Sequence, residues 1–478
     1  MLQTLKNAWK TKEIRSNILF TIFILLLYRI GTVIPVPYVE ANNFAASFSG
    51  TILDYMNLLS GGSLGTATLF ALGVSPYINA SIIIQLLAVV FPNSLGKWAK
   101  EDKKKINMVT RIVTVVLALV TAIGYYFLLA NSDALTNAAT QGEGQAFWLY
   151  AIVIVACYCA GASLIMWLAE RINDHGIGNG ISLILFANIV STIPNFVINL
   201  VSLVVDAFGY PNNRFLYGFL TLLFALVLIG ICIGLLVLVI WVTGSERRIP
   251  VQYAKRVVGR KMYGGQSSNL PIKLNMTGVM PIIFASSIVS LVPTILALCG
   301  VTSSTKGFWG GVSRVLASDG FVYPLSLFIF IILFAYFYTQ ITFDPIEVSN
   351  NLKKNGGAIP GIRQGRPTAE YISKILTKIT FVGALFLGLI AVLPVIAGPH
   401  CIQHILRWIL NGSQMASLAG DASVGSYYTS IIENSVSSLT SVFTFGGTSL
   451  LIVVGVAIET FRELEAQLTM RNYKGFLN

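Results

Sequence analysis

Charged residues are scarce in this sequence. Of its 478 residues, 55% are hydrophobic and only 11% are Asp, Glu, Lys or Arg. A soluble domain carries roughly 25% charged residues, which cover its surface with groups that water solvates. The shortage therefore excludes an ordinary water-soluble protein, and it indicates that most of the surface of this chain faces lipid.

The sequence also lacks the residue patterns of metal sites and hydrolytic enzymes. It has no CxxC pair, and four of its five cysteines fall in apolar runs, where a small polarizable side chain packs well. His400 and His404 have HxxxH spacing but no acidic third ligand nearby, which fits surface residues better than a metal site. No HExxH, GxSxG or GxxxxGKS/T motif occurs. We therefore expect no catalytic residue, no metal and no cofactor.

The chain is rich in apolar runs that are long enough to cross a bilayer. A transmembrane helix needs about 17–25 residues, and ten runs read as spans: 17–36, 73–92, 106–130, 147–169, 181–204, 216–242, 275–299, 321–342, 375–397 and 442–460. Lys and Arg collect in alternate connections, which marks the cytosolic side. Both termini are then cytosolic, and no signal-type cleavage site follows the first run. The predicted fold class is all-α, a polytopic membrane protein of about ten transmembrane helices.

Ten spans divide into two halves of five, residues 1–204 and residues 205–478 with a cytosolic tail. Because five is odd, related halves must be inserted upside down relative to each other. Inverted repeats are a common transporter plan, with the transport path at the interface between them. No convincing sequence identity relates the halves, so two inverted five-helix halves are an architectural expectation.

Three connections differ from simple loops. Residues 54–68 are too polar and glycine-rich to face lipid, so they form either an ordinary external loop or a re-entrant half-helix inside the protein. The cytosolic loops 246–273 and 343–378 mix basic, glycine and aromatic residues. They serve topology and lipid attraction, or they form shaped protrusions that dock a large acidic or RNA-bearing partner.

Carboxylates are missing from the middle of the apolar runs. Arg29 is the only obvious charge between the span ends, and it lies close to an interface. Ion-coupled transporters need ionisable groups at mid-membrane, so the sequence favours a passive conduit driven by another component. Ile78 and Ile82, one helical turn apart, suit either an apolar constriction that gates by dewetting or ordinary packing. A solute permease and an insertase or scaffold without a through-pore remain the alternatives.

Five motifs occur in a characteristic order along the chain. They are SPYINASIIIQLL (75–87), GIGNGIS (176–182), RRIPVQYAKR with the following GRKMYGGQSSNLPIKLNMTGVMPIIFASSI (247–288), NLKKNGGAIPGIRQGRPTAEYI (351–372) and FGGTSLLIVVGVAIE (445–459). Together they resemble the SecY family of bacterial protein-export channels over nearly the whole chain.

The resemblance implies a function and a set of partners. It implies the pore-forming subunit of a passive channel, not an enzyme, that translocates unfolded secretory polypeptides across the bacterial plasma membrane and releases transmembrane segments sideways. The SecA ATPase or a translating ribosome would drive it. The other implied partners are SecE, SecG, signal peptides, nascent polypeptides, membrane lipids, YidC and SecDF.

The resemblance also implies roles for particular residues. The implied pore ring consists of Ile78, Ile82, Leu185, Ile283 and Ile452. The implied plug is residues 54–68, with Asp54, Leu58, Gly61, Gly62, Leu64 and Gly65. Docking of SecA or the ribosome falls to Lys255, Arg256 and Arg363.

The implied lateral gate lies chiefly between spans two, three, seven and eight. Gln85 and Asn275 match the polar residues that latch it, and we expect Ser81, Ser286 and Ser287 to extend that network. Alternatively, these groups only satisfy partners within their own bundle. A few interhelical hydrogen bonds, worth about 0.6–2 kcal/mol each, would make a breakable latch.

Three features depart from the family pattern. Leu185 replaces an isoleucine in the ring but keeps its size and apolarity. GIRQG replaces GIRPG at residues 361–365, which predicts a looser turn. The outer segment 398–442 is longer than is typical, and the sequence offers no purpose for it.

Overall fold

The computed structural model describes most of the chain. The residues it describes are 2–40, 52–91, 95–132, 134–136, 145–208, 214–253, 256–258, 261–263, 267–301, 307–316, 322–397 and 447–469. The long outer segment 398–442, with His400 and His404, lies outside them.

Long apolar helices make up most of the structure. Eight of them, within the described residues, are long and apolar enough to cross a membrane. They are α2 (Lys12–Gly31), α6 (Lys103–Asn131), α8 (Gln145–His175), α9 (Gly180–Phe208), α10 (Arg214–Gly244), α11 (Met280–Leu298), α13 (Val322–Thr342) and α15 (Arg366–Ala397). A shorter apolar helix, α4 (Ser75–Val90), and a last helix over 447–469 cover the two remaining predicted spans. Each of the ten predicted spans thus overlaps a helix.

The first span begins and ends five residues earlier than we predicted. We expected it to run to residue 36, but α2 ends at Gly31. Pro35 and Pro37 follow, and a residue before proline is disfavoured in the helical region. The Thr32 hydroxyl donates to the Arg29 carbonyl at 2.7 Å, and Pro35 instead pairs with Thr68 in an isolated bridge.

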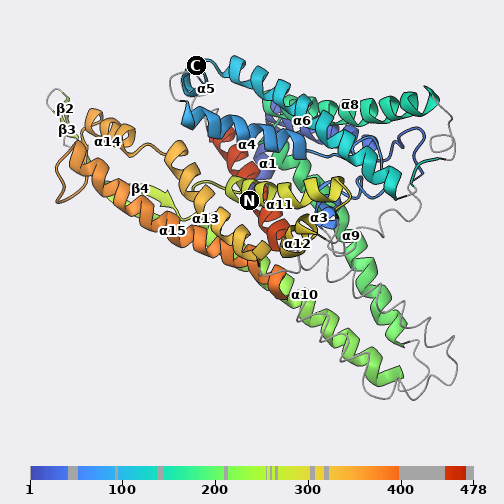
Figure 1. Ribbon diagram of the computed structural model, residues 1–478. Helices are drawn as coiled ribbons and strands as arrows, with labels where there is room; N and C mark the ends of the chain where they lie inside the picture. Colours follow the sequence, from blue (N-terminus) through green and yellow to red (C-terminus); the bar gives the residue numbers. More distant parts are fainter. Residues whose placement is uncertain are drawn as a thin grey trace.

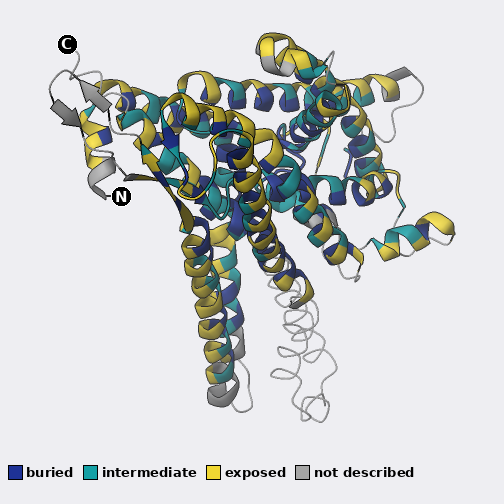
Figure 2. Ribbon diagram, turned by 90° about the vertical axis from the view of Figure 1, so that its left-hand side faces the viewer, coloured by how far each residue is buried: buried dark blue, intermediate teal, exposed yellow. Residues whose placement is uncertain are grey.

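The helices surround one central apolar cluster. It gathers side chains from α2, α4, α8, α9, α11, α13, α15 and the last helix. In Figure 2 the buried residues lie where the helices meet, and the exposed ones lie on their outer faces. A second cluster joins α6 and α8 to the segment that follows α3 (Ile52–Leu59).

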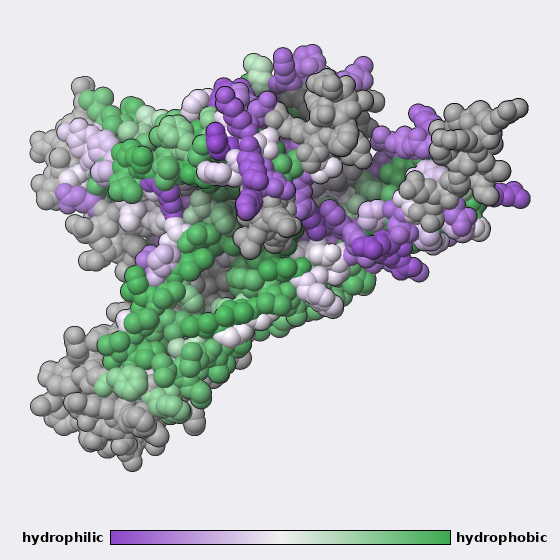
Figure 3. Space-filling view, turned by 180° about the vertical axis from the view of Figure 1, so that it is seen from behind, coloured by the Kyte–Doolittle hydropathy of each residue, from purple (hydrophilic) through white to green (hydrophobic). Residues whose placement is uncertain are grey.

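Helices α9 and α10 form a hairpin that projects from the rest of the molecule (Figure 1). Its outer part is held by a small cluster of its own, which includes Leu200, Leu203, Ala225 and Leu228. Apolar side chains cover the hairpin, whereas hydrophilic ones gather toward the opposite end of the molecule (Figure 3). Because these outward apolar faces would be costly in water, lipid is their natural solvent.

The remaining short elements lie outside the spans or between them. They are α1 (Leu2–Lys10), α5 (Leu95–Glu101), α12 (Phe308–Val315), α14 (Pro345–Lys354), β1 (Glu246–Tyr253), β2 (Arg256–Val258), β3 (Lys261–Tyr263), β4 (Ser267–Lys273) and β5 (Gly357–Ala358). The all-α expectation holds for the spans, but it did not include these strands.

A three-stranded antiparallel sheet joins the two long basic loops. Its order is β4-β1-β5, so β1 pairs with β4 of its own loop and with β5 of the other loop, where Tyr253 lies opposite Gly357. Ile249, Val251 and Ile272 of the sheet pack against Ile359 and Ile372. The two loops that we predicted as separate protrusions therefore form one body.

The last helix is bonded to the end of α10, close to the base of the sheet. The Arg462 guanidinium donates to the carbonyl of Thr243, at the end of α10, at 3.3 Å. Burial, together with the positive charge of Arg462, lowers the pKa of Lys273 at the end of β4, and Glu246 opposes this shift. The last helix thus reaches the base of the sheet, where Arg462 lies close enough to Lys273 to repel its charge.

A charge on the α10 surface tests the lipid exposure of the hairpin. Leu226 is 59% exposed and has little protein packing to lose. We expect Leu226→Arg to disfavour membrane integration by about 2.5–3.5 kcal/mol, because the side chain would face hydrocarbon. Extraction of the full chain from membranes by carbonate measures this. Gln252→Arg, exposed on β1, is the control, and equal integration of both variants would contradict the lipid assignment.

Candidate functional site

Four helices converge on a small apolar cavity at the centre of the bundle. Ile78 of α4, Leu185 of α9, Ile283 of α11 and Ile452 of the last helix line it. Its volume is about 20 Å³, little more than one water molecule needs. Side chains from both ends of the sequence therefore close the centre of the bundle.

The fifth residue of the predicted ring lies beside this cavity. Ile82 is one turn along α4 from Ile78, is 2% exposed, and belongs to the same central cluster. It does not line the cavity itself. The structure thus brings all five residues into one apolar centre, and their role as a ring stays a prediction.

The segment predicted as a plug closes one side of the cavity. It begins with α3, and Leu59 and Ser60 line the cavity next to Ile78 and Ile283. Leu58 packs against the central cluster, and Leu64 is 4% exposed. Asp54 lies within α3, and its side chain is not among those described. Of the two alternatives for this segment, the structure favours a short helix inside the protein over an external loop.

Glycines and an asparagine shape the turn after α3. Gly61 and Gly62 have φ angles of 70° and 90°, a backbone conformation that residues other than glycine rarely adopt. The Gly65 amide donates to Asn57 Oδ1 at 2.8 Å. The glycines that made this segment unusual in sequence therefore let it fold back compactly.

Two tyrosines hold the end of this segment from neighbouring spans. The Tyr125 hydroxyl of α6 donates to the Leu64 carbonyl, and the Tyr158 hydroxyl of α8 donates to the Ala67 carbonyl at 3.1 Å. Their rings meet edge to face at 5.0 Å. Sequence reasoning missed both residues. The only available signal was a buried hydroxyl in an apolar run, which needs a partner.

The polar residues predicted at the lateral gate do not pair with each other. Gln85 of α4 accepts from the Tyr338 hydroxyl of α13 at 2.6 Å and donates to Ser81 at 3.1 Å. Asn275 instead donates to the Gly278 carbonyl at 3.0 Å. Gln85 thus makes a bond between helices, whereas Asn275 precedes α11 and its amide is used in the turn. Their membership of a gate stays a prediction.

Of the serines expected in that network, Ser81 joins it by accepting from Gln85, and within the described part of the chain neither of the other two bonds to α4 or α13. Ser286 donates to the Ile283 carbonyl of its own helix at 3.0 Å, and Ser287 lines the central cavity. The interhelical link across α4 and α13 thus depends on Tyr338, which the sequence analysis did not single out.

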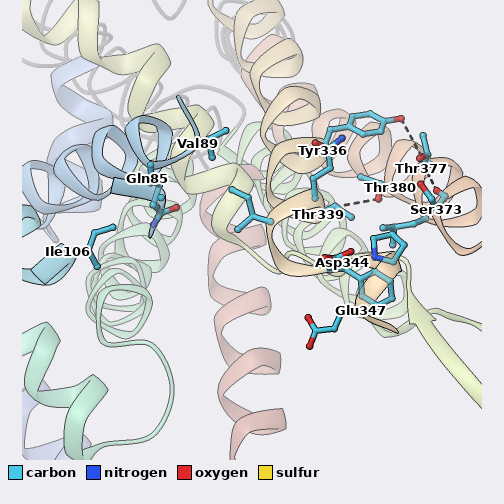
Figure 4. Close-up of a pocket in the computed structure, with 17 residues that line it drawn as sticks. Gln85, Val89, Ile106, Tyr336, Thr339, Asp344, Glu347, Ser373, Thr377 and Thr380 are labelled. Carbon is cyan, nitrogen blue, oxygen red and sulfur yellow. Dashed lines mark hydrogen bonds between the residues drawn. The ribbon is translucent and has the colours of Figure 1, made fainter. Parts of the chain in front are cut away.

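A large cleft opens beside the Gln85 and Tyr338 pair. It measures about 1000 Å³ and lies between the end of α4 with α6 on one side and α13, α14 and α15 on the other. Figure 4 shows Gln85, Val89 and Ile106 facing Tyr336, Thr339 and Thr380 across it. Its walls are mostly apolar and hydroxyl-bearing, with the carboxylates of Asp344 and Glu347 on the α14 side, so it suits a segment that is apolar along most of its length.

Of the docking residues that the resemblance implies, Arg363 lies on the body formed by the two basic loops. Arg363 is exposed in the turn between β5 and α15. Arg256 begins β2, its side chain is not described, and Lys255 lies outside the described residues. We expected GIRQG to form a looser turn than GIRPG. In the structure the Gln364 side chain of this turn donates to the Gly357 carbonyl at 3.1 Å. This bond ties the turn to the sheet.

The described residues at the centre of the bundle are uncharged and form no metal-binding site. Among the described residues, no group of three or more His, Cys, Asp or Glu side chains is arranged to hold a metal ion. The centre consists of aliphatic side chains with a few hydroxyls. An apolar constriction inside a bundle of lipid-length helices is the arrangement of a membrane channel in a sealed form.

Comparison with known proteins gives the family. The SecY family model matches residues 68–461, and the chain belongs to the SecY family. It is 38% identical to the protein translocase subunit SecY of Streptomyces coelicolor over 488 residues, with 100% of both chains covered. It is 37% identical to the subunit of the same name of Mycobacterium tuberculosis H37Rv over 493 residues, again with full coverage. By family, the chain is a channel subunit and not an enzyme.

Solved structures share the fold. One described as a protein-conducting channel matches with a TM-score of 0.57 at 17% identity, covering 94% of this chain and 91% of the other. Another, described as showing that the SecY plug domain stabilises the closed state, matches with a TM-score of 0.59 at 18% identity and the same coverage. These likenesses agree with the helical channel architecture.

The bond between Gln85 and Tyr338 gives a test of the α4–α13 seam. Tyr338→Phe removes only the hydroxyl. A single interhelical hydrogen bond in a membrane is worth on the order of 0.6–2 kcal/mol, so we expect the open population of the seam to rise roughly three- to thirtyfold. Export by signal sequences of graded hydrophobicity measures this, and weaker signals should become acceptable.

Tyr336→Phe is the matched control, since that hydroxyl donates to the Thr377 carbonyl and not to α4. An unchanged hydrophobicity threshold in both Tyr338→Phe and Gln85→Leu would contradict the latch.

Proposed function

We propose that this chain forms the pore through which unfolded secretory polypeptides cross a membrane and from which transmembrane segments leave sideways. The observation that carries the proposal is the apolar cavity closed by Ile78, Leu185, Ile283 and Ile452, with α3 against it. A conduit for whole polypeptides must pass many kinds of side chain and leak few ions. Branched apolar side chains that deform around a passing chain meet both needs.

The resting seal has two layers in this proposal. The first is the ring, with Ile82 next to it, whose apolar surface disfavours water and therefore ions. The second is the plug, residues 54–68, whose α3 packs against the ring. A passing chain displaces the plug and takes its place within the ring.

The sideways exit lies between α4 and the helices α11 and α13. Gln85 of α4 faces this seam, Asn275 precedes α11, and the 1000 Å³ cleft opens at one end of it. A hydrophobic signal helix entering the cleft replaces contacts between apolar helices with similar contacts of its own. The cost of opening is then mainly the loss of a few polar bonds such as that of Tyr338.

The driving force comes from partners that dock on the basic loops. Lys255, Arg256 and Arg363 bind a SecA ATPase or a ribosome in this proposal, and Arg363 is exposed on the sheet body. A similar solved structure is described as Sec61 in a canine ribosome–channel complex, which supports the ribosome as a partner. SecE and SecG complete the channel, and YidC, SecDF and membrane lipids act beside it.

The proposed location is the bacterial plasma membrane, with both termini in the cytosol. The curated relatives at 37–38% identity are bacterial, and the basic loops set this orientation. The halves 1–204 and 205–478 then act as two bodies that part at the α4 seam. Saturable uptake of a small solute by the chain alone would instead favour a permease.

The ring is tested by hydration. Ile283→Asn places an amide in the central cavity, and we expect a severalfold higher ion conductance in planar bilayers because the constriction becomes easier to wet. Signal-sequence stringency should fall with it. Val292→Asn is the control, since Val292 is 45% exposed on the same helix. Equal conductance of Ile283→Asn and the unaltered chain would reject the ring.

Docking is tested by charge reversal. We expect Arg363→Glu to reduce SecA-driven export or ribosome binding strongly and to leave the membrane topology unchanged, because the exposed guanidinium contacts a partner and not lipid. Lys12→Glu gives the same charge change at the exposed start of α2. If Arg363→Glu inverted the protein or left export intact, lipid attraction would explain the basic loop better.

A further inference from the structure

At the end of α3, the Leu59 carbonyl is bound by a side chain and not by a backbone amide. Gly62 donates to the Asn57 carbonyl at 2.8 Å and Gly61 to the Leu58 carbonyl at 3.1 Å. These two bonds, with Gly61 at φ 70°, form the glycine-dependent turn that commonly ends helices. The next carbonyl, that of Leu59, accepts from the side chain of Asn188 at 2.7 Å.

Asn188 joins three segments at this point. It is on α9, is 0% exposed, and its amide nitrogen donates both to the Leu59 carbonyl and to the Tyr28 hydroxyl of α2, the latter at 2.9 Å. Its Oδ1 atom is buried without a hydrogen-bond partner. A buried donor shared between two acceptors is costly to leave unused, so it holds α2, α3 and α9 together.

Arg29 places a positive charge at the same helix end. Its guanidinium donates to the Ala187 carbonyl of α9 at 3.3 Å. A Cβ atom added at Gly61 would lie 3.0 Å from Arg29 Nη1 and 3.0 Å from Asn188 Oδ1, so both side chains border the turn itself. A cation near a helix C-terminus is favourable because the exposed carbonyls there carry partial negative charge.

We propose that Asn188 and Arg29 are positioning residues that anchor the C-terminal end of α3 in its closed position. The inference rests on the proposed sealing role of α3 and deepens it. Neither side chain belongs to α3: Arg29 lies on α2 and Asn188 on α9. Moving α3 out of its seat therefore breaks the bond from Asn188 to the Leu59 carbonyl and takes the helix end away from the Arg29 charge, whatever happens at its other contacts.

The anchor also couples α3 to the ring. Leu185 and Asn188 are three residues apart on α9, which places them on one face of the helix. Leu185 lines the central cavity while Asn188 holds Leu59, which lines the same cavity. A chain that pushes α9 outward at Leu185 therefore pulls the amide away from the α3 carbonyl. Widening of the ring and release of α3 become one movement.

The test measures the position of α3 separately from the seal. Met56 of α3 contacts Thr294 of α11, whose hydroxyl lies 3.2 Å from the Met56 sulfur. Met56→Cys and Thr294→Cys are introduced into the full chain after its five native cysteines are replaced by alanine. Cross-linking by a short bifunctional thiol reagent then reports how often α3 is seated, and ion conductance in the same membranes reports the seal.

Asn188→Ala should increase the unseated population about tenfold, equivalent to about 1.4 kcal/mol, and cross-linking should slow accordingly. Arg29→Met keeps an unbranched apolar side chain but removes the positive charge near the end of α3, and it should act in the same direction. The control is Asn195→Ala, exposed on the same helix, which should cross-link like the unaltered chain. Forming the cross-link before the assay should restore the seal in Asn188→Ala, which a misfolded protein would not allow.

The outcomes separate the anchor from the channel function. Unchanged cross-linking in both Asn188→Ala and Arg29→Met would overturn the anchor and leave the proposed pore untouched. Reduced cross-linking with unchanged conductance would support the anchor and contradict the sealing role of α3. Reduced cross-linking with raised conductance that the preformed cross-link reverses would support both.

Discussion

The whole structure depends on one constraint, that polar groups in a bilayer must find their partners inside the protein. Water is absent from the hydrocarbon, so an unpaired amide or carbonyl there costs several kcal/mol. Long helices satisfy their backbone by themselves. The broken segment after α3 does not, and its carbonyls are met one by one by Tyr125, Tyr158 and Asn188. A turn at membrane depth is stable here only because three different spans supply donors to it.

The same constraint explains how the centre of the protein can be closed yet able to open. Aliphatic packing between helices competes weakly with lipid, whose tails are equally apolar. The contacts that favour the closed arrangement over others are then the few hydrogen bonds between helices, such as Tyr338 to Gln85 and Asn188 to Leu59. Bonds of this size hold a closed state firmly enough to dominate the population, and a bound segment can compensate for losing them. The apolar ring excludes ions, and the polar bonds set when it opens.

The spans could be predicted from the sequence because they depend on hydrophobicity, which each residue type shows directly. The apolar centre consists of residues of the same hydrophobic kind, and it was predicted with the help of the family resemblance. Ile78, Leu185, Ile283 and Ile452 were assigned through family motifs, and the structure places them around one cavity. The sequence did not show which polar side chains bond to each other. Gln85 on α4 bonds to Tyr338, which the sequence did not single out, and Asn275 bonds within the turn before α11, whose start the sequence did not define. Pairing of β1 with β5 likewise joins residues about a hundred positions apart, and no local pattern announces it.

The central claim is that translocating polypeptide passes through the apolar ring. The most direct measurement arrests a secretory chain in the full channel and tests disulfide formation between a cysteine in that chain and single cysteines in the protein. Leu185→Cys, 2% exposed in the closed form, should cross-link to the arrested chain, and Leu226→Cys, 59% exposed on the outer face of α10, should not. Cross-linking at Leu226→Cys with none at Leu185→Cys would show that the polypeptide takes another route, and the account would fail.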